Sequence, residues 1–388
     1  MKKKISFIFQ YKFTNGHYQN YEIKHLSKFY QITIYDLNNM YFPYLKKKSI
    51  RKEKGIKLFI INNNLELEKI IKKNPANYTF LDCSPAIASH IALLLRRLTK
   101  TKIVELKTGI LPFSVNEYRK KARNKIILTK LFFFFPFILR SIFRKIMSQV
   151  KKITMKQYIV DYLFYSGSDT LRALPMQNKN YIKKISIPSF DYNKFLKEKK
   201  FKSIVKKKYI VFVDMQLFHH DDHNIIFEEK PVTLKYFKEM NNFFTKLEKV
   251  FKLKVVIALH PSCSVKNYSS FFQNRRCFKN KTNQLIKFAE IVLTHPFTTA
   301  LSFPVIYKKP IIFLTTEEIN ESFSYNKQSE ALNSFYKIDV KNISEKKELP
   351  TTTKINVNKE FSKKYYKAFV NSTRNSKNLV EHMRKHLK

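Results

Sequence analysis

The chain has 388 residues, enough for two domains with a core each, and 44% of them are hydrophobic, which excludes a disordered protein. It carries 75 Lys and Arg against 29 Asp and Glu, a formal net charge of +46. Such a charge predicts an anionic partner, although an AT-rich coding sequence also explains abundant lysine. No arginine-rich arm, zinc-finger spacing or RNA-recognition motif occurs, so we expect phosphorylated substrates and an anionic membrane surface, and no specific nucleic acid.

Glycine is scarce, and the chain has none after Gly167. A P-loop and a dinucleotide-binding fingerprint both need several glycines and are therefore excluded. Any phosphate group has to be held by helix N-termini, hydroxyls, histidine or lysine. The three cysteines have no CxxC spacing, which predicts a reducing compartment and no zinc site.

The first half of the chain alternates short apolar runs with helical patterns. Strands are expected at 5–9, 31–35, 57–61, 78–81 and 102–106, and helices at 20–29, 65–72 and 86–98. Repeated strand–helix units of this length predict an α/β protein with a parallel sheet between helices. The apolar run at the N-terminus is short and has no cleavage site after it, so we read it as the first strand.

Residues 125–150 interrupt this pattern with four consecutive phenylalanines, Phe132 to Phe135, between basic flanks. The apolar run is far shorter than the roughly 20 residues that a membrane-spanning helix needs. It favours helices lying on a membrane surface, and a buried core helix is the alternative. We therefore expect a cytoplasmic protein that is peripheral at the inner face of the cell membrane.

The second half begins a new α/β pattern. After strands at 158–164 and 185–187, the lysine-rich stretch 194–208 is predicted to be a linker. Further strands are expected at 209–213, 254–259, 291–294 and 310–314, with a weaker one near Cys277, and helices at 232–250, 283–289 and 299–307. We predict an N-terminal domain over 1–200, a second α/β domain over 209–350, and a basic helical tail over 357–388 that packs across both.

Polar residues follow three strands of the second half. Asp214, His260 and the pair Thr298-Thr299 all occur where a strand gives way to a loop. Ligands of open parallel sheets bind beyond the carboxyl ends of the strands, so these residues are candidates for a ligand site. Pro261 stops the strand before it, so the imidazole of His260 is expected to face the cleft and bind or protonate a phosphate. A surface histidine at a strand end is the alternative.

Thr298 and Thr299 precede an apolar helix. Threonine is a good N-cap, which explains the pair without any ligand. A capped N-terminus with amides and hydroxyls also binds phosphate without glycine. His295, three residues earlier, adds a second imidazole.

The loop from Asp214 to His223 holds three histidines and three aspartates. Such a cluster is able to bind zinc or manganese. No second cluster completes a metal site, so we expect no metal ion and no other cofactor. A role of His220 and Asp222 in positioning the sugar or the acceptor is favoured.

Residues 209–315 resemble bacterial glycosyltransferases of the GT-B fold that use CMP-activated acidic sugars. These are the sialyltransferases, polysialyltransferases and Kdo transferases of surface-polysaccharide assembly. Their HP motif matches His260-Pro261, their Ser/Thr pair matches Thr298-Thr299, and a D-x5-H-x-D pattern of related capsule and lipopolysaccharide transferases matches Asp214, His220 and Asp222. The resemblance implies two Rossmann-like domains facing a cleft, an acceptor-side domain over 1–200 and a nucleotide-sugar-binding domain over 209–350. It also implies that His260 contacts the donor phosphate as general acid and that the hydroxyl pair holds the same phosphate.

The sequence departs from this family at the catalytic base. The base motif of the sialyltransferases, two acidic residues followed by glycine, is absent, and the hydroxyl pair is Thr-Thr. An inverting transfer needs a carboxylate to accept the proton of the acceptor hydroxyl. Asp36, Asp82 and Glu105 in the first half and Asp214 in the second are the candidates.

The sequence thus predicts an inverting, metal-independent glycosyltransferase. It would move a sugar from a CMP donor, such as a nonulosonic acid or Kdo, to a lipopolysaccharide or capsule acceptor. A polyanion-binding protein without enzymatic activity is the first alternative. A UDP-, GDP- or CDP-linked donor, or a polyol-phosphate polymerase, is the second.

Overall fold

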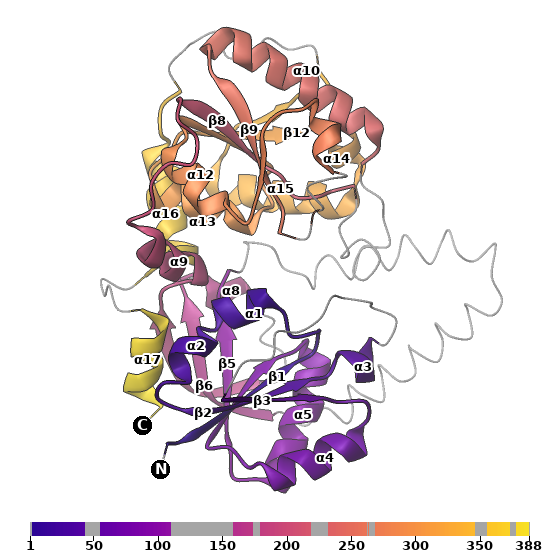
Figure 1. Ribbon diagram of the computed structural model, residues 1–388, viewed down its shortest axis with the longest axis vertical. Helices are drawn as coiled ribbons and strands as arrows, with labels where there is room; N and C mark the ends of the chain where they lie inside the picture. The colour runs from indigo at the N-terminus through magenta and orange to yellow at the C-terminus, as the bar shows by residue number, and fades with distance from the viewer. Residues whose placement is uncertain are drawn as a thin grey trace, which may run out of the picture.

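The computed structural model describes residues 2–42, 55–109, 158–173, 179–218, 232–261, 263, 268–345, 355–372 and 378–387. These residues form two separate parallel sheets with helices around each, arranged as two lobes along the long axis of the molecule (Figure 1). The basic aromatic segment 125–150 lies outside the described residues, and so do His220 and Asp222. No helix among the described residues is long and apolar enough to cross a membrane.

The first sheet has the strand order β3-β2-β1-β4-β5-β6-β7, and every neighbouring pair is parallel. Its strands are β1 (Lys4–Phe9), β2 (Gln31–Asp36), β3 (Ile56–Ile60), β4 (Tyr78–Asp82), β5 (Lys102–Lys107), β6 (Tyr158–Ser166) and β7 (Lys179–Ile187). Helices cover both faces, so the central strands are near-continuous apolar runs. Separate apolar clusters on the two faces of the sheet contain Phe7 and Ile8, neighbours in β1.

The helices of this lobe are mostly short. They are α1 (Asn15–Asn20), α2 (Ile23–Leu26), α3 (Asn38–Tyr41), α4 (Asn64–Lys73), α5 (Pro85–Leu98) and α8 (Thr170–Ala173). The prediction of one helix over 20–29 was wrong. Glu22 takes a left-handed conformation with φ of 54° and breaks the segment, and its carboxylate bonds to Nδ1 of His25 at 2.9 Å.

The second sheet has the order β10-β9-β8-β11-β12-β13 and is also parallel throughout. Its strands are β8 (Tyr209–Val213), β9 (Lys254–Leu259), β10 (Cys277–Lys279), β11 (Ile291–Thr294), β12 (Ile311–Thr315) and β13 (Val340–Asn342). Its helices are α10 (Leu234–Phe251), η2 (Ser269–Phe272), α12 (Thr282–Phe288), η3 (Thr299–Leu301), α13 (Ser302–Ile306), α14 (Glu317–Glu321) and α15 (Phe323–Tyr336).

The segment between the sheets is partly helical. The predicted linker 194–208 begins inside α9 (Phe190–Glu198), a helix that Ser189 caps by accepting a bond from the amide of Tyr192 at 3.2 Å. Side chains of α12 fasten this segment to the second lobe. Asn283 donates to Glu198 at 2.6 Å, and Gln284 donates to the carbonyl of Lys202 at 2.6 Å.

The C-terminal tail packs first against the second lobe and then returns to the first lobe. We predicted from the sequence that it packs across both. It consists of α16 (Lys359–Tyr365), the π-helical η4 (Tyr366–Val370) and α17 (Leu379–His386). α16 and η4 join the apolar cluster that contains Leu301 and Phe313 of the second lobe. α17 joins the cluster that contains Phe7 of β1. Two segments therefore connect the lobes, α9 and this tail.

Candidate functional site

The order in which the chain adds strands to the first sheet reverses at β1. The chain places β2 and β3 on one side of β1 and then crosses to β4 on the other side. Ligands of open α/β sheets bind in the crevice at such a switch point, outside the carboxyl ends of the strands. Asp82 is the last residue of β4, and His17 lies on α1, which follows β1. The two side chains meet there, with Nε2 of His17 at 4.0 Å from Oδ2 of Asp82.

The tautomer of His17 follows from its other nitrogen. Nδ1 accepts a bond from the amide of Thr14 at 3.1 Å, part of the capping box that begins α1. The remaining proton of the neutral ring is then on Nε2, which faces Asp82. The hydroxyl of Tyr21 also bonds to Asp82, and burial raises the pKa of this tyrosine well above its ordinary value. The side chain of Asp82 is nevertheless 42% exposed.

The other two acidic candidates of this lobe are buried in structural bonds. Asp36 is 1% exposed and accepts bonds from the amides of Phe13 at 2.8 Å and Asn38 at 2.9 Å. Glu105 is fully buried and lies 3.8 Å from the ammonium of Lys107. Of the three acids that the sequence singled out here, Asp82 alone presents a carboxylate to solvent.

The second sheet has its switch point at β8, which lies between β9 and β11. Asp214 follows β8 and is 3% exposed. Its carboxylate accepts bonds from the amide of Gln216 at 3.2 Å and the hydroxyl of Tyr268 at 3.5 Å, and it lies 3.5 Å from Sγ of Cys263. Burial raises the pKa of Asp214 to about 6, against the opposing effect of these hydrogen bonds.

These bonds join the loop after β8 to the loop after β9. The amide of Asp214 donates to the carbonyl of Ala258 at 3.0 Å, and the amide of Cys263 donates to the carbonyl of His260 at 3.0 Å. A bond from the backbone of His260 also reaches the carboxylate of Asp214. β9 ends at Leu259 as expected, with His260 half-buried and Pro261 exposed. The structure thus brings Asp214 and His260 together.

His295 follows β11 and has no exposed surface. Its Nδ1 bonds to the carbonyl of Leu314 at 2.8 Å, and its Nε2 bonds to the hydroxyl of Tyr236 at 2.9 Å. Burial lowers the pKa of this imidazole to about 4, so the ring is neutral at pH 7. Its ring is stacked on Phe297 with centroids 5.6 Å apart. Both nitrogens are used inside the fold, and the ring supports the loop that leads to Thr298.

The two threonines have different environments. Thr298 is 6% exposed and caps η3, its hydroxyl accepting a bond from the amide of Ala300 at 3.2 Å, which confirms the predicted cap. Thr299 is the first residue of η3 and its side chain is exposed. Because β8, β9 and β11 are neighbours, Asp214, His260 and this pair lie at one edge of the sheet.

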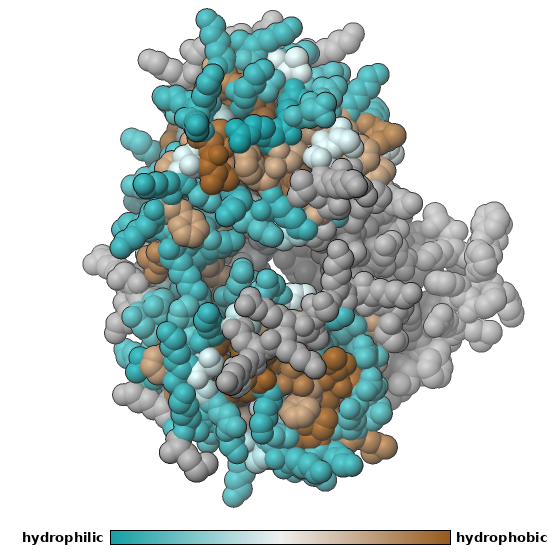
Figure 2. Space-filling view, viewed as in Figure 1, coloured by the Kyte–Doolittle hydropathy of each residue, from teal (hydrophilic) through white to brown (hydrophobic). Residues whose placement is uncertain are grey.

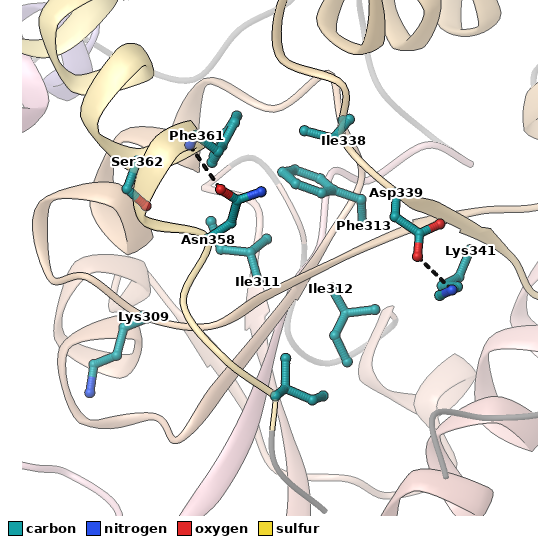
Figure 3. A pocket seen from close by; sticks show the side chains of 11 residues that line it. Lys309, Ile311, Ile312, Phe313, Ile338, Asp339, Lys341, Asn358, Phe361 and Ser362 are labelled. Atoms are coloured by element: carbon teal, nitrogen blue, oxygen red, sulfur yellow. Dashed lines mark hydrogen bonds and ion pairs between the residues drawn. The ribbon is translucent and has the colours of Figure 1, made fainter. Parts of the chain in front are cut away.

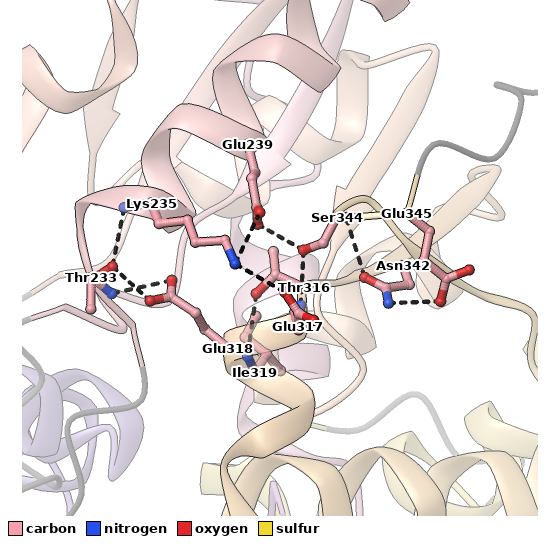
Figure 4. A network of polar contacts seen from close by, with 10 residues as sticks. All are labelled: Thr233, Lys235, Glu239, Thr316, Glu317, Glu318, Ile319, Asn342, Ser344 and Glu345. Atoms are coloured by element: carbon pink, nitrogen blue, oxygen red, sulfur yellow. Dashed lines mark hydrogen bonds and ion pairs between the residues drawn. The ribbon is translucent and has the colours of Figure 1, made fainter.

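A polar network lies at the same carboxyl edge of the second sheet, beyond β12 and β13 (Figure 4). Thr233, the N-cap of α10, donates through its hydroxyl to Glu318 of α14 at 2.6 Å. Lys235 pairs with Glu317 at 2.9 Å, and the amide of Glu317 donates to Ser344 beyond β13 at 2.9 Å. The network fixes the N-terminus of α10 against the loops after β12 and β13.

A pocket of about 330 Å³ lies at the amino ends of β12 and β13 (Figure 3). Lys309 and Ile311 line it at the start of β12, and Asp339 lines it just before β13, paired with Lys341 at 2.6 Å. This is the amino end of the sheet, opposite to Asp214. Asp214, His260 and the threonine pair are not among the residues that line the pocket.

The described residues contain no group of three or more His, Cys, Asp or Glu side chains placed to hold a metal ion. The histidine-rich loop over 219–223 lies outside them. The expectation of no metal ion therefore stays a prediction.

A hollow separates the two lobes on the face shown in Figure 2. The fold of this chain is similar to that of several solved structures. One is the glycotransferase of kitacinnamycin, 8% identical, with a TM-score of 0.50 over 89% of this chain and 87% of that one. Another is a putative UDP-N-acetylglucosamine 2-epimerase from Listeria monocytogenes, 9% identical, with a TM-score of 0.50 over 100% and 96%. The chain has the GT-B fold, two Rossmann-like domains facing a cleft. No protein-family model and no curated sequence matches it.

Proposed function

We propose that the protein is a glycosyltransferase in which the first domain activates the acceptor and the second binds a nucleotide-sugar donor. The pair of His17 and Asp82 carries this proposal. It provides an accessible carboxylate with two positioning partners at the switch point of the first sheet. The sequence left four carboxylates as candidates for the base, and Asp82 is the one of them that is both exposed and held by neighbouring side chains.

The reaction is a single displacement at the anomeric carbon. The carboxylate of Asp82 accepts the proton of the acceptor hydroxyl while the oxygen of that hydroxyl forms the new bond to the anomeric carbon. The bond from the sugar to the donor phosphate breaks, and the negative charge that develops on the phosphate is stabilised by His260 and by the hydroxyl of Thr299. Such a displacement inverts the anomeric centre and needs no metal ion.

Asp214 and His295 are positioning residues in this proposal. Asp214 is buried and bonds to the loop that carries His260, so it orients that imidazole. His295 is buried beneath the loop that leads to Thr298. Neither needs to touch the donor. His220 and Asp222 remain candidates for contacts to the sugar or the acceptor.

The HP motif and the threonine pair favour a CMP-linked acidic sugar as donor. The net charge of +46 favours an anionic acceptor, such as a lipid-linked surface glycan, and an enzyme held at the inner face of the cell membrane. UDP-, GDP- and CDP-linked donors are the competitors, and the nucleotide screen below separates them.

The first experiment measures the melting temperature with CMP, UDP, GDP and CDP. A ligand that binds the native state alone raises the melting temperature, and we expect CMP to do so most. His260→Ala should remove the shift, while His90→Ala, which changes an exposed imidazole on α5, should keep it. Failure of all four nucleotides to shift the wild type would contradict the proposal. Binding to polyanions that weakens steeply with salt would then favour the alternative without enzymatic activity.

The second measurement in this test follows turnover of the donor that the screen identifies. Asp82→Asn should lower turnover by about two orders of magnitude or more and leave nucleotide binding unchanged, since the base acts on the acceptor. Asp339→Asn removes an exposed carboxylate at the opposite edge of the second sheet and should leave turnover unchanged. Full activity of the Asp82 variant would exclude this residue as the base.

A further inference from the structure

A second pocket, of about 810 Å³, lies where the two lobes are connected. Its lining comes from α9, α13, α16 and η4. Figure 1 shows α9, α13 and α16 next to one another at one side of the molecule, and η4 packs against α13 and α16. It is therefore built from both segments that link the domains. It is separate from the carboxyl edges of both sheets, where the proposed reaction takes place.

The walls of this pocket are apolar and largely aromatic. Tyr192 and Phe195 of α9 face Ile306 of α13 and Tyr366 of η4, and all four are half-buried. The rings of Tyr192 and Tyr366 meet edge to face with centroids 6.3 Å apart, and their hydroxyls are hydrogen-bonded. The rings of Tyr192 and Phe195 are 5.6 Å apart. The apolar surface is thus held in place by contacts between the two connecting segments.

Three lysines surround this apolar surface. Lys308 follows α13, and Lys359 and Lys363 lie one turn apart on α16; all three line the pocket and are exposed. None of the described residues that line it is acidic. Across the part of the chain that the structure describes, none of the three lysines forms an ion pair. Their neighbour Lys364, by contrast, pairs with Glu360 at 2.6 Å.

We propose that this pocket binds an anionic amphiphile, a lipid with an alkyl chain and a phosphate head. The apolar walls take the chain, because burying hydrocarbon there removes it from water. The three ammonium groups take the phosphate as point charges around the mouth. The volume falls in the roughly 300–1,000 Å³ range of small-molecule sites, larger than a free phosphate ion needs. The proposal does not depend on the glycosyl-transfer reaction.

Isothermal titration of the full-length protein with dodecyl phosphate, below its micellar concentration, tests this. Wild type should bind one molecule, and octyl phosphate should bind at least about tenfold more weakly because it buries four fewer methylene groups. The double variant Lys359→Ala/Lys363→Ala should lose about thirtyfold in affinity, since each lysine contributes about 1 kcal/mol toward an anionic lipid. Lys364→Ala, on the same helix outside the pocket, should bind like wild type.

Several results would overturn the proposal. They are equal affinity of wild type and the double variant, equal affinity for dodecyl and octyl phosphate, or inorganic phosphate or CMP binding as tightly as dodecyl phosphate. A dimer in sedimentation velocity that the double variant dissociates would instead assign the surface to a second copy of the chain. Both substitutions are at exposed positions, and unchanged melting temperatures of the variants will show that the fold is kept.

Discussion

At the scale of single residues, Asp214 links ionisation to stability. Its carboxyl has a pKa of about 6 in the folded protein against 3.8 in the unfolded chain, because it is buried. Between pH 4 and pH 6 the folded state therefore holds a proton that the unfolded state has lost. The stability that the folded state gains from this proton is present in full below about pH 4 and is lost as the pH rises through 6.

The prediction concerns the difference in unfolding free energy between wild type and Asp214→Asn. Taking the difference cancels His295, whose lowered pKa acts in the opposite direction. The stability of wild type relative to the variant should fall by roughly 2–3 kcal/mol from pH 4 to pH 7, since each pKa unit corresponds to about 1.4 kcal/mol. Urea unfolding at several pH values measures this. A difference that stays constant over the whole range would show that Asp214 does not titrate there.

The sequence indicated part of the site and missed His17. A strand that runs into a proline placed His260 correctly at the end of β9, and residue type alone predicted Thr298 as a cap. The sequence did not indicate His17 because this residue follows β1 and its partner Asp82 ends β4. Apolar patterns do not show that these two strands are neighbours. The burial of His295 was hidden for the same reason. Its partners Tyr236 and Leu314 come from α10 and β12.

At the scale of elements, the turn after β6 and the end of η4 fit together closely. The last carbonyls of a helix need donors from outside it. The amides of Ser168 and Asp169 donate to the carbonyls of Lys367 and Ala368 at 3.0 and 3.1 Å. Gly167 makes this approach possible. Its φ is +75°, and a Cβ atom there would lie 2.0 Å from the carbonyl oxygen of Ala368.

Gly167→Ala should therefore separate the turn from η4. We expect a loss of at least about 2 kcal/mol in unfolding free energy, since both the left-handed backbone and the collision contribute. Gly109→Ala is the matched control, with φ of +67° and nothing within 4 Å of the added Cβ. It should cost about 1 kcal/mol from the backbone alone. Equal losses in the two variants, measured by urea unfolding, would show that the contact with η4 contributes nothing.

The strands were easier to predict than the helices that connect them. An apolar run buried on both faces is visible in the sequence, so β8, β9 and β11 have the predicted bounds. The break between α1 and α2 depends on the left-handed Glu22, a residue without a preference for that conformation. The second half of α9, residues 194–198, was predicted to belong to a linker because it is rich in lysine. In the structure this helix packs against α13.

At the scale of the whole molecule, the tail contributes side chains to the apolar clusters of both domains. The sequence predicted two α/β units, and the alternation of strands and helices was sufficient for that. The sheet orders and the place where the tail docks depend on contacts between distant segments, which periodicity does not encode. Leu379 and Met383 of α17 have no exposed surface and belong to the apolar cluster of the first sheet.

The first domain should therefore lose stability when the last helix of the chain is altered. Met383→Ala should cost about 2–5 kcal/mol, the usual range for truncating a buried side chain. Hydrogen exchange measured by mass spectrometry should show faster exchange in β1 and β2 than in wild type, with β8 and β9 little changed, because the domains have separate cores. Lys385→Ala, at an exposed position of the same helix, should leave both sheets protected. Faster exchange in β8 and β9 to the same degree would mean that the two domains unfold as one unit, so that α17 stabilises the whole molecule and not the first domain alone.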